Sequence, residues 1–257
     1  MTVTLIPAPV ALKESALSAD ALLLLGLGLL LAGVPAAATL PRVPQAAYLL
    51  AIGGAALCAL AAVLALAGPA VRLDLGAVAP FARMLLRLDG LSAFFVLAIA
   101  GLTLPVGVYA LGYVDRHHYG EPVVGAAFCA FVAAMLGVVL ADSVFSFLLC
   151  WELMSLASFL LVMHDHQQAA VRRAGFIYMA MTHAGAAFLV AAFLLLAAAT
   201  GSLTFDGFRT AAAGLDEVTR NGAFLLFLVG FAAKAGAIPL HVWLPRAHPR
   251  SEEHTSE

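Results

Sequence analysis

Two ionisable residues stand inside apolar runs that are long enough to cross a lipid bilayer. The first is Glu152, near the middle of FSFLLCWELMSLASFLLVM (Phe145–Met163), and the second is Lys234, in the run Gly222–Ile238. A charge at the bilayer centre costs about 2.5–3.5 kcal/mol on insertion scales, so such residues tend to pair and to mark ion or proton pathways. We therefore expect Glu152 and Lys234 to face each other, or a shared hydrated path, inside a helix bundle.

Each of these residues also has a structural interpretation. Glu152 is alternatively a protonated acid that is hydrogen-bonded to a neighbouring helix. Lys234 is alternatively a side chain that extends along its helix toward the membrane interface. If the two groups are close in a low dielectric, each strongly biases the charge of the other, and coupled protonation of this kind suits proton transfer.

Three further residues can support such chemistry. Pro239 removes its own backbone N–H and disfavours helix, which predicts a break in the seventh apolar run and a hydrated pocket one turn from Lys234. His183 lies in the middle of the sixth apolar run, where it either relays protons or bonds across helices. Asp142 precedes the fifth run and either caps that helix or pairs with a base; we favour the cap.

The composition places the chain in the membrane. Of its 257 residues, 63% are hydrophobic and 11% are charged, and the mean hydropathy is +1.02. Soluble domains are about 45–50% apolar and about 25% charged. A net charge of −2 without a basic patch gives no indication of nucleic-acid binding.

No cofactor or metal site is predicted. The three cysteines lie in apolar runs without C-x-x-C spacing, so we expect buried small side chains and no disulfide framework, zinc site or iron–sulfur cluster. The chain has no phosphate-binding glycine loop, nucleophile elbow or dinucleotide fingerprint. We therefore expect no redox centre and no catalytic residue in this chain.

The predicted fold is all-α, a polytopic transmembrane helix bundle. A span needs about 20 apolar residues, and seven runs qualify: Ala19–Thr39, Ala46–Ala67, Leu91–Tyr113, Val123–Leu140, Phe145–Met163, Ala174–Thr200 and Gly222–Ile238. Between the second and third runs, Phe81, Leu85 and Leu88 share one helical face beside arginines. This pattern predicts a short interfacial amphipathic helix within residues 71–89. Lys and Arg are split six to five between the two sides, which sets no orientation.

The two ends of the chain differ in character. Met1–Asp20 lacks the basic region and short apolar core of a cleaved signal peptide. Arg250–Glu257 reads RSEEHTSE, an abrupt polar octapeptide that resembles the translation of a sequencing adapter. We therefore treat 250–257 as a non-native tail and expect the rest to be an N-terminal fragment.

The runs WELMSLASFLLVMH and GFAAKAGAIPLHVWLPRAHP resemble the fifth and seventh helices of the antiporter-like proton-translocating membrane subunits. That superfamily includes subunits of respiratory complex I and of Mrp antiporters. The wording FIYMAMTHAG and PLHVWLPRAHP most resembles its branch called hydrogenase-4 component B, or formate hydrogenlyase membrane subunit. LDGLSAFFVL and GVYALGYV resemble the third helix of the family.

The resemblance implies a division of the chain. Family members have roughly fourteen helices with two inverted repeats. Residues 1–113 would form three N-terminal helices with an interfacial segment at 71–89, and 114–249 the first part of the translocating repeat. The resemblance also places the N-terminus in the periplasm of a bacterium and the chain in the inner membrane as a multi-pass protein.

The resemblance further implies a proton pathway. Glu152 and Lys234 match the family's buried glutamate and lysine, and we count His183 and His248 with the same pathway. The implied function is proton translocation for a hydrogenase-like or NADH:quinone oxidoreductase-like complex, with other membrane subunits and soluble hydrogenase or quinone-reductase subunits as partners. The alternatives are an Mrp-like cation/proton antiporter subunit, with sodium as an alternative to the proton, and a non-transporting membrane anchor for soluble redox subunits.

Overall fold

Helices dominate the computed structural model, which describes residues 18–40, 45–79, 82–113, 122–164 and 166–247. The helices are α1 (Ala19–Thr39), α2 (Gln45–Ala67), α3 (Gly90–Tyr113), α4 (Pro122–Leu140), α5 (Val144–Val162), α6 (Ala169–Thr200), α7 (Phe205–Ala211), η1 (Ala212–Gly214), α8 (Glu217–Ala235), η2 (Leu240–Trp243) and α9 (Leu244–Ala247). Seven segments are long and apolar enough to span a membrane: α1 to α6 and the stretch Glu217–Trp243. The predicted bundle of seven spans is confirmed.

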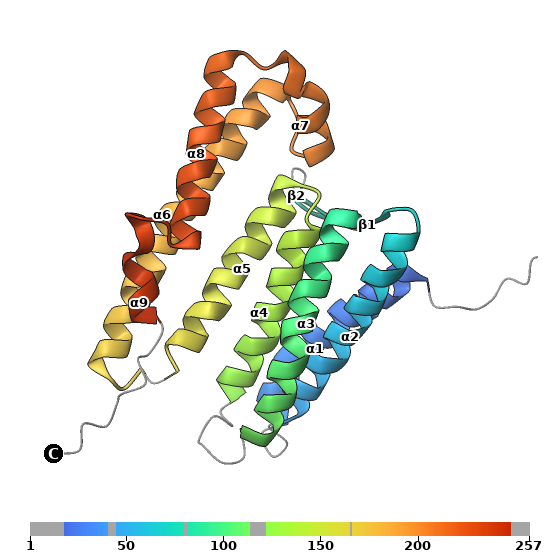
Figure 1. The fold of residues 1–257 in the computed structure, drawn as a ribbon, viewed down its shortest axis with the longest axis vertical. Helices are drawn as coiled ribbons and strands as arrows, with labels where there is room; N and C mark the ends of the chain where they lie inside the picture. The colour runs from blue at the N-terminus through green and yellow to red at the C-terminus, as the bar shows by residue number, and fades with distance from the viewer. Residues whose placement is uncertain (1–17, 41–44, 80–81, 114–121, 165, 248–257) are drawn as a thin grey trace, which may run out of the picture.

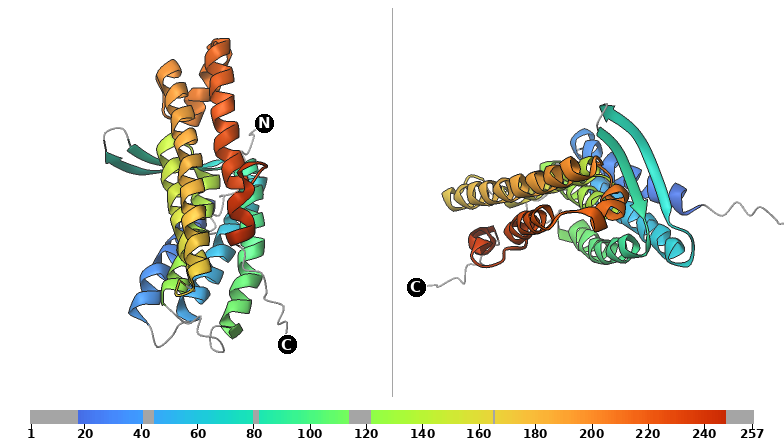
Figure 2. Two further views of the ribbon diagram at one scale, coloured as in Figure 1. Left: turned by 90° about the vertical axis from the view of Figure 1, so that its left-hand side faces the viewer. Right: turned by 90° about the horizontal axis from the view of Figure 1, so that it is seen from above.

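The spans form two groups (Figure 1). In the first, α1 packs on α2 and α4, α2 packs on α3, and α4 packs on α5. In the second, α6 and α8 pack chiefly on each other, and α6 also contacts α5. Seen from above, the α6–α8 pair forms a separate layer beside the first group (Figure 2). The junction between the groups therefore lies along α5, the helix that carries Glu152.

Small residues allow the helices of the first group to approach closely. A Cβ at Gly26 of α1 would lie 2.6 Å from Sγ of Cys58 and 2.8 Å from the carbonyl oxygen of Gly54, both on α2. Backbone approach at small residues is a main source of helix association in membranes. The three cysteines are buried and free, as the sequence predicts, and Cys129 donates a hydrogen bond to the carbonyl of Ala47 at 3.2 Å.

The segment between α2 and α3 is a β-hairpin, so the predicted amphipathic helix is wrong. Strand β1 (Val71–Ala79) pairs antiparallel with β2 (Ala82–Leu88). Leu86 and Leu88 are buried on either side of the more exposed Arg87, which is the period of two that a strand requires. Three residues at helical spacing suggested a helix, whereas the alternation of the β1 segment VRLDL was the better indicator.

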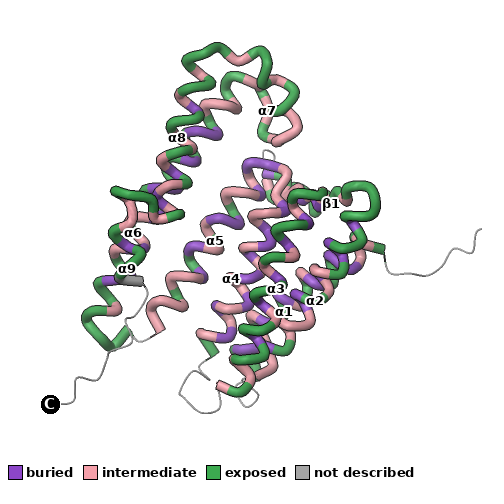
Figure 3. The backbone as a smooth tube through the Cα atoms, in the orientation of Figure 1, coloured by how far each residue is buried: buried purple, intermediate pink, exposed green. Residues whose placement is uncertain are grey.

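The hairpin is fixed to the turn between α4 and α5. The backbone N–H of Leu85 donates to Oγ of Ser146 at 2.8 Å, and its carbonyl accepts from the N–H of Asp142 at 3.0 Å. Ser143 donates to the carbonyl of Arg83 at 3.1 Å. These bonds satisfy β2 backbone groups that lack a partner in the two-stranded sheet. Figure 3 shows that buried positions concentrate in the first group of spans, while α8 exposes most of its surface.

Candidate functional site

Helix α8 presents Lys234 in its last turn. The helix begins after Asp216, whose side chain accepts from the N–H of Thr219 at 2.9 Å and so caps the first turn. It ends at Ala235, because Gly236 adopts a left-handed conformation with φ +70°. Glycine is the usual residue at this position, since it has no Cβ to clash there.

The interruption predicted at Pro239 is present, and it begins three residues earlier, at Gly236. The chain then continues as the short helices η2 and α9. Trp243 in η2 returns toward α8, and its indole Nε1 donates to the carbonyl of Ala233 at 2.8 Å. Backbone groups at membrane depth need a partner in the protein or in a hydrated cavity. Trp243 supplies one of these partners at the broken end of α8.

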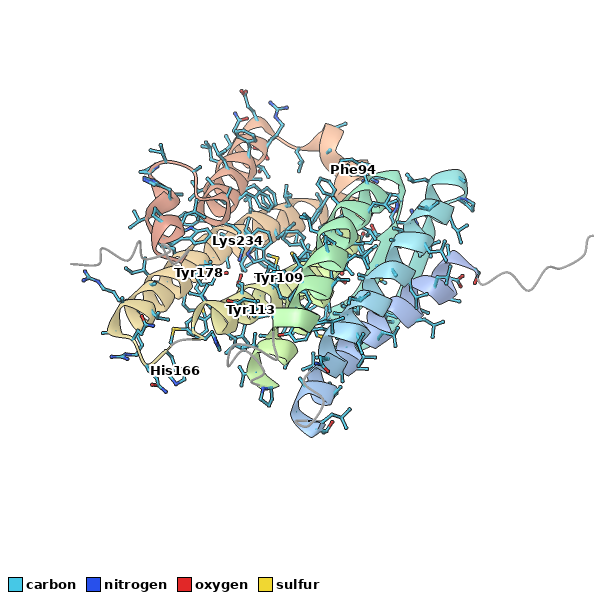
Figure 4. All side chains as sticks on the ribbon, turned by 60° about the horizontal axis from the view of Figure 1, so that its bottom comes forward. Phe94, Tyr109, Tyr113, His166, Tyr178 and Lys234 are labelled. Atoms are coloured by element: carbon cyan, nitrogen blue, oxygen red, sulfur yellow. The ribbon has the colours of Figure 1, made fainter. Side chains whose placement is uncertain are left out.

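The side chain of Lys234 lies among hydroxyl groups and aromatic rings (Figure 4). Its Nζ donates to Oγ of Ser155 at 3.1 Å and to Oη of Tyr178 at 3.0 Å. It also lies over the rings of Trp151 and Tyr178, at 5.9 Å and 5.3 Å from their centroids. Because α5 supplies Trp151 and Ser155 and α6 supplies Tyr178, the lysine connects three of the spans.

The hydroxyl groups around Lys234 form a continuous chain. Ser155 donates to the carbonyl of Trp151 at 3.0 Å, and Ser158 donates to the carbonyl of Ser155 at 3.0 Å. Tyr178 and Ser158 form a further close hydroxyl contact. Since Ser155 and Ser158 use their protons on backbone carbonyls, Ser155 accepts from Lys234 and Tyr178 is left to donate to Ser158.

Glu152 has a different partner. Its Oε2 lies 3.4 Å from Nε2 of His183 on α6, and both side chains remain partly exposed, by 41% and 57%. Nδ1 of His183 is 3.1 Å from the carbonyl oxygen of Met179. The two groups line an open pocket of about 350 Å³ whose other walls are apolar: Leu149, Leu153, Leu156 and Met179.

The structure does not bring Glu152 and Lys234 into direct contact, which was one of the two arrangements that the sequence suggested. Among the described residues, the ion pairs of 4.0 Å or less do not include these two together. Lys234 reaches α5 at Ser155, three residues after Glu152, and positions three apart are neighbours on a helix surface. Lys234 therefore contacts α5 within one turn of Glu152, on an adjacent part of the helix surface.

Asp142 is not the cap of α5. Ser143 occupies that position, and its side chain accepts from the N–H of Ser146. The hairpin contacts set this register, because Ser143 and Ser146 both bond to β2. Burial and the neighbouring charge of Asp206 raise the pKa of Asp142 above its usual value, although nearby arginines act in the opposite direction.

A second charged cluster lies outside the spans and was not predicted. Asp206 of α7 accepts from Arg72 at 2.7 Å, from Arg87 at 3.0 Å and from Arg209 at 2.8 Å. Burial alone would raise the pKa of Asp206, but the charges of Arg72 and Arg87 hold it below its usual value. The cluster ties the hairpin to α7, two segments that are more than 100 residues apart in sequence.

The sequence identified the charged residues and missed the neutral ones around them. Tyr178, Ser155 and Trp151 have no unusual sequence context, except that Trp151 and Ser155 lie four residues apart and so share a helix face. His248 lies outside the described residues. Within the described part of the chain, no three His, Cys, Asp or Glu side chains gather closely enough to hold a metal ion.

Residues 141–255, which include both the Glu152 and the Lys234 regions, match the family described as NADH:quinone oxidoreductase/Mrp antiporter, transmembrane. An uncharacterized protein of Mycobacterium tuberculosis is 44% identical over 184 residues, which cover 72% of this chain and 28% of that protein. Hydrogenase-4 component B of Escherichia coli K12 is 40% identical over 177 residues, covering 68% of this chain and 26% of its own length. The chain thus spans about a quarter of the length of these curated relatives.

The fold has a counterpart among solved structures. A chain of the Mrp complex from Dietzia sp. DQ12-45-1b superposes with a TM-score of 0.73 at 24% sequence identity, over 89% of this chain and 25% of that one. At this identity the likeness concerns the fold alone. It extends the similarity beyond the matched segment 141–255 to most of the seven spans.

Proposed function

Because this chain carries the membrane domain of the NADH:quinone oxidoreductase/Mrp antiporter family over residues 141–255, we propose that it is a proton-translocating subunit of a respiratory-type oxidoreductase complex. Glu152 and Lys234 are its proton-carrying groups, and His183 and His248 extend the pathway. Electron transfer takes place in partner subunits of the hydrogenase or quinone-reductase type. The complex lies in the inner membrane of a bacterium, where this chain is a multi-pass subunit.

One observation carries the proposal: Lys234 of α8 contacts α5 within one helical turn of Glu152, and both residues lie inside membrane-spanning segments. Glu152 has an imidazole as its neighbour, and Lys234 has two hydroxyl groups and two aromatic rings. Neither group is neutralised by a direct ion pair with the other. Among the described residues, Lys234 also has no other ion-pair partner within 4.0 Å, so it can change its charge without breaking a salt bridge, which a fixed structural pair could not do.

The arrangement allows stepwise proton transfer. Glu152 and His183 exchange a proton most readily, because their polar atoms are 3.4 Å apart. An ionised Glu152 favours the charged form of Lys234, and protonation of Glu152 removes that support. A charge change in a neighbouring subunit would then change the protonation of both Glu152 and Lys234. This would drive proton uptake on one side of the membrane and proton release on the other.

The test uses Glu152→Gln and Lys234→Ala in cells that produce the chain together with the products of its neighbouring genes. We expect proton pumping by inverted membrane vesicles to fall at least about a hundredfold in each variant, because a positioned proton-transfer group contributes about 10²–10⁴-fold. Assembly of the complex, measured by native electrophoresis, should be unchanged. Pumping is followed as substrate-driven acidification with a fluorescent dye.

Glu217→Gln is the matched control, because Glu217 is a carboxylate in the first turn of α8, at the far end from Lys234. It should pump normally. Normal pumping by Glu152→Gln or Lys234→Ala would contradict the assignment. If neutralising both residues together affects neither pumping nor assembly, the chain is instead a membrane anchor for soluble redox subunits.

An Mrp-like cation/proton antiporter subunit is the second candidate, because the matched family also covers Mrp antiporters. This function needs no redox partner. Vesicles energised by an artificial pH gradient would then show sodium-dependent proton exchange without any electron donor. Exchange under those conditions would favour the antiporter, and its absence together with substrate-driven pumping would favour the oxidoreductase subunit.

A further inference from the structure

Among the described residues, Tyr178 is the one that contacts Lys234 through both a hydroxyl group and an aromatic face. Its Oη accepts from Nζ at 3.0 Å, and its ring centroid lies 5.3 Å from the same atom. The ring is itself held in place, since it packs edge-on against Trp243 with centroids 5.2 Å apart. Trp243 in turn bonds to the carbonyl of Ala233, one residue before the lysine.

These contacts favour the two charge states of Lys234 unequally. A neutral amine has two N–H groups, and an ammonium has three. The hydroxyls of Ser155 and Tyr178 accept from Lys234 in either state, but more strongly from the ammonium, because a hydrogen bond to a charged group is about twice as strong as one between neutral groups. The faces of Trp151 and Tyr178 attract the cation alone, because a ring face carries negative charge density.

No stronger group in the described part of the chain overrides these contacts. The titratable groups on the elements packed around Lys234 are Cys150 and Glu152 on α5, Arg172, Arg173, Tyr178 and His183 on α6, and His241 on η2. Glu152 is engaged with His183, and no ion pair of 4.0 Å or less among the described residues includes Lys234. The charges of α8 itself, Glu217 and Arg220, lie at its opposite end.

We infer that Tyr178 is a positioning residue for Lys234: its hydroxyl fixes Nζ in both protonation states, and its hydroxyl and ring together favour the charged state. The orientation of the hydroxyl chain follows from this role. Because Oη of Tyr178 donates to Ser158, its lone pairs are directed to the lysine. The inference rests on the proposed role of Lys234 as a proton carrier, and it names the residue that sets when the lysine releases its proton.

The test can be made without any transport, because the chain has only two lysines, Lys13 and Lys234. In a Lys13→Arg background, ¹⁵N-labelled lysine gives a single side-chain signal from the full chain in lipid nanodiscs. The titration of that signal with pH reports the protonation of Lys234 directly. We compare Tyr178→Phe, which keeps the ring and its packing, with Tyr109→Phe as a matched control. Tyr109 is on α3, where it stacks on Tyr113.

Tyr178→Phe should move the midpoint of the Lys234 titration to lower pH by about one unit, the weight of one hydrogen bond to a charged group. Tyr109→Phe should leave it unchanged. In vesicles, the pumping rate of Tyr178→Phe should begin to fall at a lower pH on the alkaline side of its pH profile. A purely structural defect would lower the rate without shifting this profile. An unchanged midpoint in Tyr178→Phe would overturn the inference.

A second variant covers the case in which Tyr178→Phe does not fold. Fluorotyrosine incorporated at position 178 keeps the shape of the side chain and weakens its hydroxyl as an acceptor. It should produce a smaller shift to lower pH, and no shift would again overturn the inference. If Tyr178→Phe shifts the titration of the lysine signal as expected but Lys234→Ala pumps normally, the proposed function is refuted while the positioning role stands.

Discussion

Lys234 can remain charged at membrane depth without a carboxylate partner. The cost of a lysine at the bilayer centre is about 2.5–3.5 kcal/mol on insertion scales. A hydrogen bond to a charged group contributes about 1.5–3 kcal/mol, and a desolvated cation over an aromatic face about 2 kcal/mol. Two hydroxyls and two rings together therefore offset the cost.

Replacing Lys234 by arginine separates a permanent charge from an exchangeable proton. The guanidinium keeps the positive charge and stacks on aromatic rings, but it does not release its proton in proteins. We expect Lys234→Arg to assemble normally and its pumping rate to fall at least about a hundredfold. The measurement is substrate-driven acidification in inverted vesicles, with Arg220→Lys in the first turn of α8 as the control.

Full activity in Lys234→Arg would mean that the lysine acts only as a fixed charge. Proton transfer would then have to pass through the other residues of the proposed pathway, Glu152, His183 and His248. This outcome would not affect the structural account of the hydroxyl groups around Lys234, because arginine can donate to the same acceptors.

The sequence was sufficient to locate Glu152, Lys234 and His183, since a charge in a long apolar run stands out by itself. It was not sufficient to pair them. Which side chain meets Lys234 depends on the rotation of α5 and α6 about their axes, and their apolar residues are distributed too evenly to fix that rotation. The neutral partners Ser155 and Tyr178 are ordinary residues in a helix, so only the packed structure reveals them.

At the level of the elements, the seven spans follow from the lengths of the apolar runs, but the connection between α2 and α3 does not. The sequence VRLDL alternates polar and apolar residues, yet a hairpin of two strands is marginal in isolation. It is stabilised here by contacts that are remote in sequence, from Ser143 and Ser146. The same contacts explain why Ser143, rather than Asp142, caps α5.

Asp142 therefore makes no capping hydrogen bond, and its ionised carboxylate lowers the stability of the fold at neutral pH. Its pKa in the folded protein is raised, chiefly by burial and then by Asp206. A carboxyl group of this kind stabilises the fold at low pH, and that contribution is lost as the pH rises through the raised pKa. Asp142→Asn should raise the thermal midpoint at pH 7 by up to about 2 °C, since the site is partly solvated. At pH 3, where both side chains are neutral, the variant should match the parent.

Asp74→Asn is a control with the opposite sign. A hydrogen bond from the N–H of Gly76 and the neighbouring Arg83 hold the pKa of Asp74 below its usual value despite some desolvation. Its stabilising contribution is therefore present at neutral pH and is lost as the pH falls. Melting curves in detergent at both pH values check the pair. A lower midpoint for Asp142→Asn at pH 7 would show that its carboxylate is needed for the contact between the turn and the hairpin.

At the scale of the whole molecule, three connections meet on one side of the spans. They are the hairpin, the turn between α4 and α5, and the segment around α7. Leu86 pairs with Ala141, Ser143 pairs with Thr204, and Arg72 bonds to Asp206. An odd number of crossings separates each of these connections from the loops at the opposite end. That these three connections lie on the same side follows from the alternation of seven spans, which the sequence predicts. The contacts that join them could not be predicted from the sequence.

The distribution of Lys and Arg does not determine which side of the membrane the hairpin and its two neighbouring connections face. We expect them to face the periplasm, because the family resemblance places the N-terminus there and an even number of spans separates the N-terminus from the hairpin. Val78→Cys in β1 and Gln167→Cys between α5 and α6 report the two sides, since both positions are exposed. In a variant without the native cysteines, a membrane-impermeant thiol reagent should label Val78→Cys in intact spheroplasts and Gln167→Cys only after lysis. Labelling in the reverse order would invert the orientation, and with it the direction of proton movement through Lys234. Labelling of both from one side would contradict the crossing of α3, α4 and α5 between them, and so the fold itself.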